Sequence, residues 1–111
     1  MASPTITLRT KREIPAIGLG VYKTEPGPTT RNAVSAALDV GYRHIDTAFI
    51  YNNEVDVGEA IAGSGLNRGD VFVTTKLWND DHGYENTLQA FDLRLELLGL
   101  TYVDLYLIHW P

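Results

Sequence analysis

The fold is decided by residues 71–109, which read VFVTTKLWNDDHGYENTLQAFDLRLELLGLTYVDLYLIH. Two short runs rich in branched apolar residues, 71–77 and 103–109, stand at its ends and predict strands. Residues 84–98 between them predict a helix, because their larger apolar residues recur at helical spacing. These residues are Leu88, Phe91, Leu95 and Leu98. A strand, a helix and a second strand in this order build a parallel sheet.

The same alternation extends back to residue 17. Further strands are predicted at 17–21 and 44–47, with helices at 28–40 and near 53–62. The four strands begin at residues 17, 44, 71 and 103, so their starts are 27, 27 and 32 residues apart. Eight such units would give roughly the 250 residues of a (β/α)₈ barrel. We therefore predict an α/β fold, the N-terminal half of a TIM barrel with its first four strands.

Local signals refine this prediction. Thr29 or Thr30 is the expected N-cap of the helix at 28–40. Residues 5–8 and 13–14 flank a polar turn and predict a short hairpin that caps one end. A single domain, 1–111, is expected, with the hairpin in 1–16 and the βα units in 17–111. One face of the second helix is predicted to carry Val55, Gly58, Ile61 and Ala62.

Composition excludes several classes of protein. Of the 111 residues, 44% are hydrophobic and the formal net charge is −5, which disfavours nucleic acid or an anionic membrane as a partner. The sequence contains no cysteine, so a disulfide scaffold, a thiolate metal site and a thiol nucleophile are ruled out. No apolar stretch has the length of a signal peptide core or a membrane span. A cytoplasmic protein is expected.

Common nucleotide, hydrolase and metal motifs do not occur. The glycines Gly18 and Gly20 do not complete a dinucleotide fingerprint, because Lys23 stands where the third glycine belongs. There is no phosphate-binding loop of the Walker type and no Gly-x-Ser-x-Gly elbow. His82 follows two aspartates in a predicted solvated loop, and the histidines lack metal-ligand spacing. No metal site is expected.

Three of the predicted strands end in an ionisable residue, namely Asp46, Lys76 and His109. The carboxyl ends of parallel strands share one face, where sites form from residues far apart in sequence. Tyr51 lies five residues after Asp46, in a loop that can reach the same face. We therefore expect these four side chains to meet.

Each of the four also has a purely structural explanation. Asp46 could satisfy turn amides, His109 could be a hydrogen-bonded core residue, and Tyr51 could be an ordinary loop residue. Lys76 is harder to explain in this way, because a lysine in a covered strand needs a carboxylate partner or a lowered pKa. Together they favour a site, since perturbed titratable groups gather in functional clefts.

Such a cluster suits proton transfer to a carbonyl oxygen. A phenol, with a reference pKa of about 10, is a poor acid near neutral pH. An ammonium about 4 Å away would stabilise the phenolate by up to about 4 kcal/mol at an effective dielectric of about 20. Tyr51 is therefore expected to act as a general acid or base, with Asp46 holding Lys76 and His109 donating a hydrogen bond.

Four stretches of the sequence carry a resemblance to a known family. They are IPAIGLG (14–20), GYRHIDTA (41–48) followed by Tyr51, Glu54 and Gly58, TKLW (75–78), and LIHWP (107–111). Together they resemble the signatures of the aldo-keto reductases over essentially the whole chain. Within that family, residues 78–80 and 103–111 are most similar to bacterial members of the 2,5-diketogluconate reductase type.

The resemblance implies a TIM barrel that uses NADPH to reduce aldehydes and ketones. It implies a catalytic tetrad, with Tyr51 as proton donor, Lys76 beside it, Asp46 paired with Lys76, and His109 orienting the carbonyl. The residues it places at the cofactor are Gly20, Val21, Tyr22 and Asp46. The residues it places around the substrate are Tyr22, Phe49, Trp78 and Trp110, with ordinary aromatic packing as the alternative for each.

The chain ends at Pro111, within the predicted fourth strand unit. A barrel's phosphate site lies near its last strands, so we expect cofactor affinity to be reduced and the exposed strand edges to favour self-association or binding of a complementary C-terminal half. Two hypotheses follow. The first is an NADPH-dependent carbonyl reductase that requires the C-terminal half. The second is a non-catalytic fragment or interaction module that inherits the tetrad.

Overall fold

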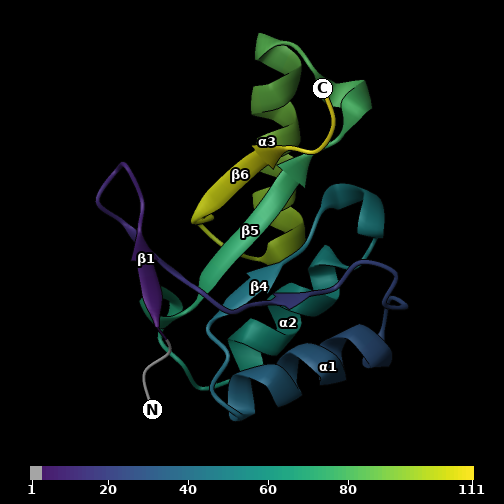
Figure 1. Cartoon of the computed structure of the whole chain (residues 1–111). Coiled ribbons are helices and arrows are strands. Elements are labelled where there is room, and N and C mark those ends of the chain that lie inside the picture. The colour runs from purple at the N-terminus through teal and green to yellow at the C-terminus, as the bar shows by residue number, and fades with distance from the viewer. Residues whose placement is uncertain (1–3) are drawn as a thin grey trace.

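The computed structural model describes residues 4–111, which form a small antiparallel hairpin and a parallel sheet with helices between its strands (Figure 1). The strands are β1 (Thr5–Thr7), β2 (Glu13–Pro15), β3 (Leu19–Gly20), β4 (His44–Asp46), β5 (Phe72–Leu77) and β6 (Leu105–Ile108). The helices are α1 (Pro28–Asp39), α2 (Glu54–Gly63) and α3 (Tyr84–Leu98), with the 3₁₀ turns η1 (Phe49–Tyr51), η2 (Arg68–Asp70) and η3 (Asn79–Asp81). Each predicted strand and helix is present, with ends shifted by a few residues.

The main sheet has the order β3-β4-β5-β6, and all neighbouring strands are parallel. Each strand therefore pairs with the next one in the chain, as a βα series predicts. The register places Asp46 beside Gly20 on one side and beside Thr74 on the other. Lys76 pairs with Leu107. The carboxyl ends of all four strands consequently lie along one edge.

The predicted hairpin is confirmed. Strands β1 and β2 are antiparallel, with Ile6 opposite Ile14. The hairpin lies near the end of the sheet where β5 begins (Figure 1). The Arg12 Nη2 atom lies 3.6 Å from Oδ1 of Asp104, the residue just before β6. The hairpin is thereby linked to the amino-terminal end of the sheet, away from the edge that carries Asp46.

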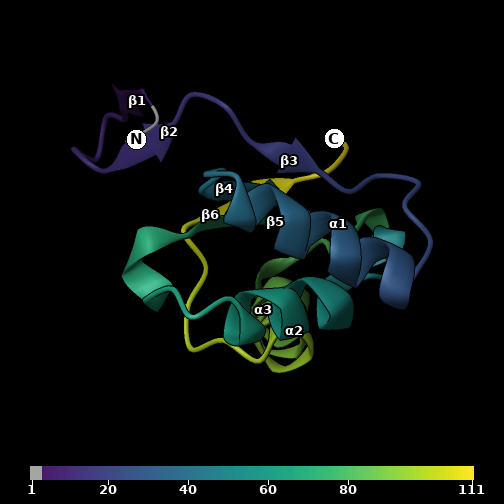
Figure 2. The same ribbon diagram turned by 90° about the horizontal axis from the view of Figure 1, so that it is seen from below.

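The helices cover one face of the sheet (Figure 2). Alternate residues of a strand face opposite sides of the sheet. Ile45 and Val73 face the helices and are fully buried. Burial of each such branched side chain contributes about 1.5–3 kcal/mol. The core formed there contains Val21, Val34, Leu38, Ile45, Val57, Ala60, Ile61, Val71, Val73 and Leu98.

The predicted N-cap of α1 was wrong. The helix begins at Pro28 with Gly27 as its N-cap, and Thr30 lies inside the first turn. Proline suits this position because its fixed φ is already helical and the missing N–H would have had no partner within the helix. The buried Thr30 hydroxyl instead donates to the carbonyl oxygen of Glu25 at 2.6 Å.

The predicted face of α2 was only partly right. Gly58 and Ile61 are buried, but Val55 is 46% exposed and Ala62 is exposed. The helix also buries two acidic residues, Glu54 and Asp56. Gly58 is required here, because a Cβ at this position would overlap the carbonyl oxygen of Leu98. Close contact with α3 therefore sets the orientation of α2.

The predicted stripe on α3 was shifted in the same way. Leu88 is 50% exposed, whereas Ala90, Arg94 and Leu98 are buried. The helix is rotated so that Arg94, and not Leu88, faces the sheet, because Arg94 has a buried carboxylate partner in Glu54. Apolar spacing alone could not reveal this partner, which lies 40 residues earlier in the chain.

The described helices are too short or too polar to cross a lipid bilayer. This holds for residues 4–111, the part of the chain that the structure describes.

Candidate active site

Asp46 and Lys76 meet at the carboxyl edge of the sheet, on the face that the helices leave uncovered. Their strands, β4 and β5, are adjacent, and the Lys76 Nζ atom lies 2.8 Å from Asp46 Oδ1. Nζ also donates to the carbonyl oxygen of Thr47 at 2.9 Å. The Lys76 side chain is 13% exposed and that of Asp46 is 37% exposed. The lysine thus has the carboxylate partner that the sequence predicts.

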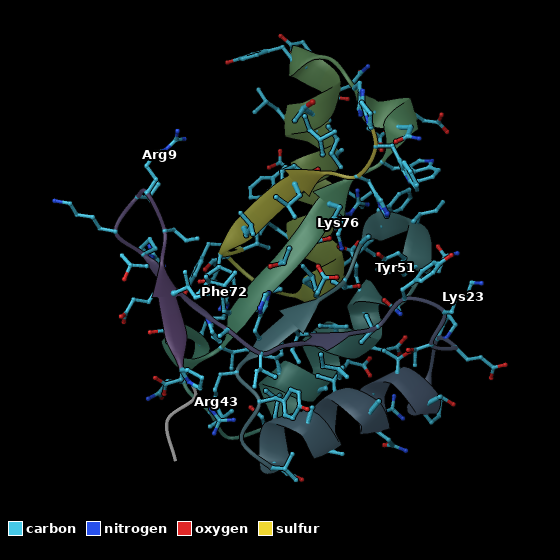
Figure 3. The ribbon with its side chains drawn as sticks, viewed as in Figure 1. Arg9, Lys23, Arg43, Tyr51, Phe72 and Lys76 are labelled. Carbon is cyan, nitrogen blue, oxygen red and sulfur yellow. The ribbon has the colours of Figure 1, made fainter. Side chains whose placement is uncertain are left out.

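Tyr51 stands at the end of η1, near Lys76 (Figure 3). Its phenol oxygen lies 3.5 Å from Lys76 Nζ, and the ammonium sits 5.1 Å from the ring centroid. The next residue, Asn52, has a φ of 59°, in the left-handed region that asparagine tolerates better than most residues. This turn lets the chain leave η1 and enter α2 without moving the phenol away from Lys76.

The loop that carries Tyr51 is anchored by Asn53, which is fully buried. Its side-chain oxygen accepts a hydrogen bond from the hydroxyl of Thr47 at 2.8 Å, and its amide nitrogen donates to the carbonyl oxygen of Val21 at 3.0 Å. The loop is thereby joined to the ends of both β4 and β3. Sequence reasoning missed Asn53 and Thr47. The available signal was Asn53 itself, a polar residue two positions after Tyr51 and directly before α2.

His109 follows β6 directly and completes the cluster. Its backbone N–H donates to the carbonyl oxygen of Leu77 at 3.1 Å, and its ring meets the Tyr51 ring edge-on at 5.7 Å. Within residues 4–111 its Nδ1 atom has no hydrogen-bond partner. Desolvation, followed by the positive charge of Lys76, lowers the pKa of His109, and Asp46 opposes this shift. The neutral imidazole is therefore favoured.

Three predicted aromatic residues surround this pair of rings. Tyr22 packs on Tyr51 at 5.2 Å, Trp78 meets His109 edge-on at 5.5 Å, and Trp110 stacks on His109 at 6.1 Å. Tyr22 and Trp110 are 65% and 57% exposed. The structure thus brings together residues from the ends of β3, β5 and β6, with flat apolar surfaces that a small organic molecule can contact.

Two other predicted site residues, Phe49 and Val21, lie away from this cluster. Phe49 does not join the aromatic group: its ring lies over the guanidinium of Arg94, 3.9 Å away, on the helix side. Val21 is 1% exposed and part of the core, and both of its backbone groups are hydrogen-bonded, to Asp46 and Asn53. Gly20 does border the site, because a Cβ placed there would come 4.0 Å from Asp46 Oδ2.

A second polar group lies beneath the cluster, on the other face of β5. Thr75 donates its hydroxyl hydrogen to Glu54 Oε2 at 2.6 Å, and Arg94 Nε lies 2.8 Å from Glu54 Oε1. Burial raises the pKa of Glu54, while Thr75 and then Arg94 oppose the shift. Sequence reasoning gave these residues no role, although a threonine in an otherwise apolar strand position was a signal.

This arrangement suits chemistry at a carbonyl oxygen. An oxygen atom placed between Tyr51 and His109 would meet a phenol and an imidazole, with the Lys76 ammonium close behind the phenol. Such preorganised groups stabilise charge that develops on oxygen. Among residues 4–111, no three acidic or histidine side chains are grouped so that they could hold a metal ion.

Comparison with known proteins points in one direction. The model of the Aldo/keto reductase family matches residues 16–111. A glyoxal reductase from Bacillus subtilis is 53% identical over 96% of this chain, which covers 39% of that protein. More generally, the chain spans about two fifths of the length of the curated relatives it matches.

Solved structures agree. An aldo/keto reductase from Brucella melitensis is 58% identical and superposes with a TM-score of 0.95, over 100% of this chain and 42% of that one. An aldo-keto reductase from Bombyx mori, solved in complex with NADP, is 42% identical with a TM-score of 0.92, over 100% of this chain and 39% of that one. The predicted fold, the N-terminal half of a TIM barrel, is thereby confirmed.

Proposed function

Because the chain belongs to the aldo/keto reductase family, we propose that it takes part in the reduction of aldehydes and ketones to alcohols, with NADPH as hydride source and Tyr51 as proton donor. We propose that this activity requires a complementary C-terminal half. The observation that carries this proposal is the position of the Lys76 ammonium, which joins Asp46 at 2.8 Å and Tyr51 at 3.5 Å. The finer resemblance to the 2,5-diketogluconate reductase type stays a prediction.

The residues at this face fit a flat cofactor ring. Gly20 presents backbone without a side chain beside Asp46, and the Tyr22 ring is 65% exposed next to Tyr51. These three residues, Gly20, Tyr22 and Asp46, are the ones we propose to hold the nicotinamide end. When bound, a reduced nicotinamide supplies the hydride.

The protein's own residues supply the proton and the field around it. Tyr51 donates its phenolic proton to the carbonyl oxygen, and the Lys76 ammonium stabilises the phenolate that remains. Lys76 is fixed for this role by Asp46 Oδ1 and the carbonyl oxygen of Thr47, at 2.8 and 2.9 Å. These two acceptors fix the position of the ammonium. It therefore stays beside the phenol oxygen when the phenol loses its proton.

His109 orients the substrate. Its neutral form can donate one ring N–H to the carbonyl oxygen, and the lowered pKa keeps that form dominant near neutral pH. The neighbouring Trp78 and Trp110 rings contact the imidazole on an edge and a face. They restrict its rotation and present apolar surface to the rest of the substrate.

The test is the consumption of NADPH by the protein in the presence of a small reactive aldehyde. Tyr51→Phe is expected to lower kcat by about 10²- to 10⁴-fold, the usual contribution of a general acid, without unfolding the protein. Tyr84→Phe is the matched control, because Tyr84 is 81% exposed on α3, and it should leave the rate unchanged. A folded protein that neither turns over nor alters NADPH fluorescence would reject autonomous catalysis. The same result after addition of the complementary C-terminal half would favour the non-catalytic alternative.

A further inference from the structure

We propose that the buried ion pair of Glu54 and Arg94 is a positioning device that sets the distance between Tyr51 and Lys76 from the opposite face of the sheet. The inference rests on the proposed function, in which Tyr51 and Lys76 form the proton-donating pair. Neither Glu54 nor Arg94 contacts the open face, so both are positioning residues.

The pair connects three elements that surround the site. Glu54 is the first residue of α2, Arg94 lies in α3 and Thr75 lies in β5. The Glu54 carboxylate uses one oxygen for Arg94, at 2.8 Å, and the other for Thr75, at 2.6 Å. The guanidinium also lies 3.9 Å from the ring centroid of Phe49 in η1. Each link is a directional contact in a buried site.

The residues joined by these links are close in sequence to Lys76 and Tyr51, the proton-donating pair. Thr75 immediately precedes Lys76, so a hydrogen bond that holds Thr75 on one face fixes where Lys76 emerges on the other. Phe49 is two residues before Tyr51, and Glu54 is three residues after it. Turn η1 thus lies between two contacts of the same buried pair, at Phe49 and at Glu54. The distance between Lys76 Nζ and the phenol oxygen, 3.5 Å, is expected to depend on these contacts.

Stability alone does not account for the pair. Buried ion pairs are weak sources of stability, and apolar residues of similar volume usually replace them without loss. Burial is the largest effect on Glu54 and raises its pKa, so the charged form has a cost in this place. Apolar side chains would fill the space without fixing a direction. Directional positioning is what the charged and hydrogen-bonded pair adds.

The experiment separates positioning from folding with a double variant, Glu54→Leu with Arg94→Met. It removes one charge of each sign and leaves the site filled, so the free energy of unfolding is expected to stay close to that of the wild type. The matched control is Glu59→Leu with Arg31→Met, which removes the surface pair between the same helix α2 and α1, 3.1 Å long and about half exposed.

Two readouts are compared. The first needs no turnover: the ¹³Cζ resonance of Tyr51, assigned with Tyr51→Phe, is followed through an alkaline titration. In the buried-pair variant its midpoint is expected to differ from the wild type by about half a pH unit or more, because the ammonium no longer sits at the same distance. The second is kinetic: kcat should fall about tenfold with little change in KM. The control variant should change neither.

The outcomes are distinguishable. A buried-pair variant that is folded, with an unchanged Tyr51 titration, overturns the inference. A shifted titration in a protein that never reduces the aldehyde, even with the complementary C-terminal half added, supports the inference and contradicts the proposed function instead. If the double variant does not fold, Arg94→Lys replaces it, since it keeps the charge but loses the planar contact with Phe49. An unchanged Tyr51 titration in that variant shows that the guanidinium plane does not position Phe49 and Tyr51, and overturns the inference for η1.

Discussion

Two ion pairs flank β5, one on each face, and their shortest N···O distances are the same. Lys76 and Asp46 are 2.8 Å apart on the open face, and Arg94 and Glu54 are 2.8 Å apart on the helix-covered face. Their surroundings differ greatly. The side chains of the first pair are 13% and 37% exposed, whereas those of the second are 1% and 2% exposed.

The comparison shows that distance does not define the role of an ion pair. Lys76 also contacts Thr47 and Tyr51, and water can reach Asp46, so the charges of this pair can respond to a change in protonation nearby. Arg94 and Glu54 are shielded from solvent and held by Thr75 and Phe49. The open pair suits chemistry, and the buried pair suits a fixed geometry.

The largest expected difference in the free energy of unfolding is between two variants, each of which removes the acidic residue of one pair. Glu54→Gln should lower the free energy of unfolding by about 3–5 kcal/mol, because it leaves the Arg94 charge buried without its partner. Asp46→Asn should lower it by under about 1 kcal/mol, since this pair is partly hydrated. Denaturant unfolding of both variants measures the difference. Equal losses would show that the two pairs do not differ in the way described.

A second test compares the tightness of packing on the two faces. Gly58→Ala should destabilise the protein by about 1–3 kcal/mol or more, because the new Cβ would overlap the Leu98 carbonyl oxygen and force α2 and α3 apart. Gly20→Ala should cost less, since the nearest atom to its Cβ would be Asp46 Oδ2 at 4.0 Å. Thermal unfolding monitored by circular dichroism distinguishes them. A tolerated Gly58→Ala would contradict this account of α2 and α3.

A third test uses pH, because the two faces should respond with opposite signs. Burial lowers the pKa of His44 below its usual 6.5, although Asp46 opposes the shift. Its contribution to the free energy of unfolding is therefore present above pH 6.5 and lost as the pH falls through the folded-state value. Burial raises the pKa of Glu54 above its usual 4.5, so its contribution is present below pH 4.5 and lost as the pH rises through the folded-state value.

The measurement is the difference in the free energy of unfolding between wild type and variant across pH. The His44→Gln difference should show the wild type losing its advantage on the acidic side. The difference for Glu54→Leu with Arg94→Met should show the wild type gaining on the acidic side. Curves with the same slope would contradict the assigned burial of one of the two groups.

The smallest effect is expected at the surface. Glu59→Gln breaks the contact of Glu59 with Arg31, in which the side chains are 52% and 40% exposed. The loss should be under about 1 kcal/mol and should shrink further as salt is added. Denaturant unfolding at low and high ionic strength measures both. A loss as large as that of Glu54→Gln would mean that burial does not control these pairs.

Much of the fold could be predicted from the sequence, because its signals are local. Short branched runs and helical spacing predicted the four parallel strands and the helices between them. The meeting of Asp46 and Lys76 followed from strand direction alone, since parallel strands end at the same edge. The 2.8 Å distance between their side-chain atoms could be found only from the structure. The catalytic roles assigned to them remain proposals.

The errors arose where a distant partner overrode a local pattern. Leu88 fits an apolar stripe on α3, but Arg94 occupies the buried face because Glu54 lies opposite. Phe49 is next to the site in sequence, yet its ring turns to the guanidinium of Arg94. Hydrophobic periodicity treats a charge as exposed, so it cannot predict a helix face that buries an ion pair.

The order of the strands in the sheet also sets the order in which the site residues can come together during synthesis. Each strand of the sheet pairs with the next strand in the chain, so β4, β5 and β6 can each add to an edge that already exists as the chain emerges from the ribosome. Asp46 and Tyr51 then come first, Lys76 joins them when β5 docks, and His109 arrives last with β6. The imidazole that completes the cluster is therefore the last of the four side chains to emerge from the ribosome.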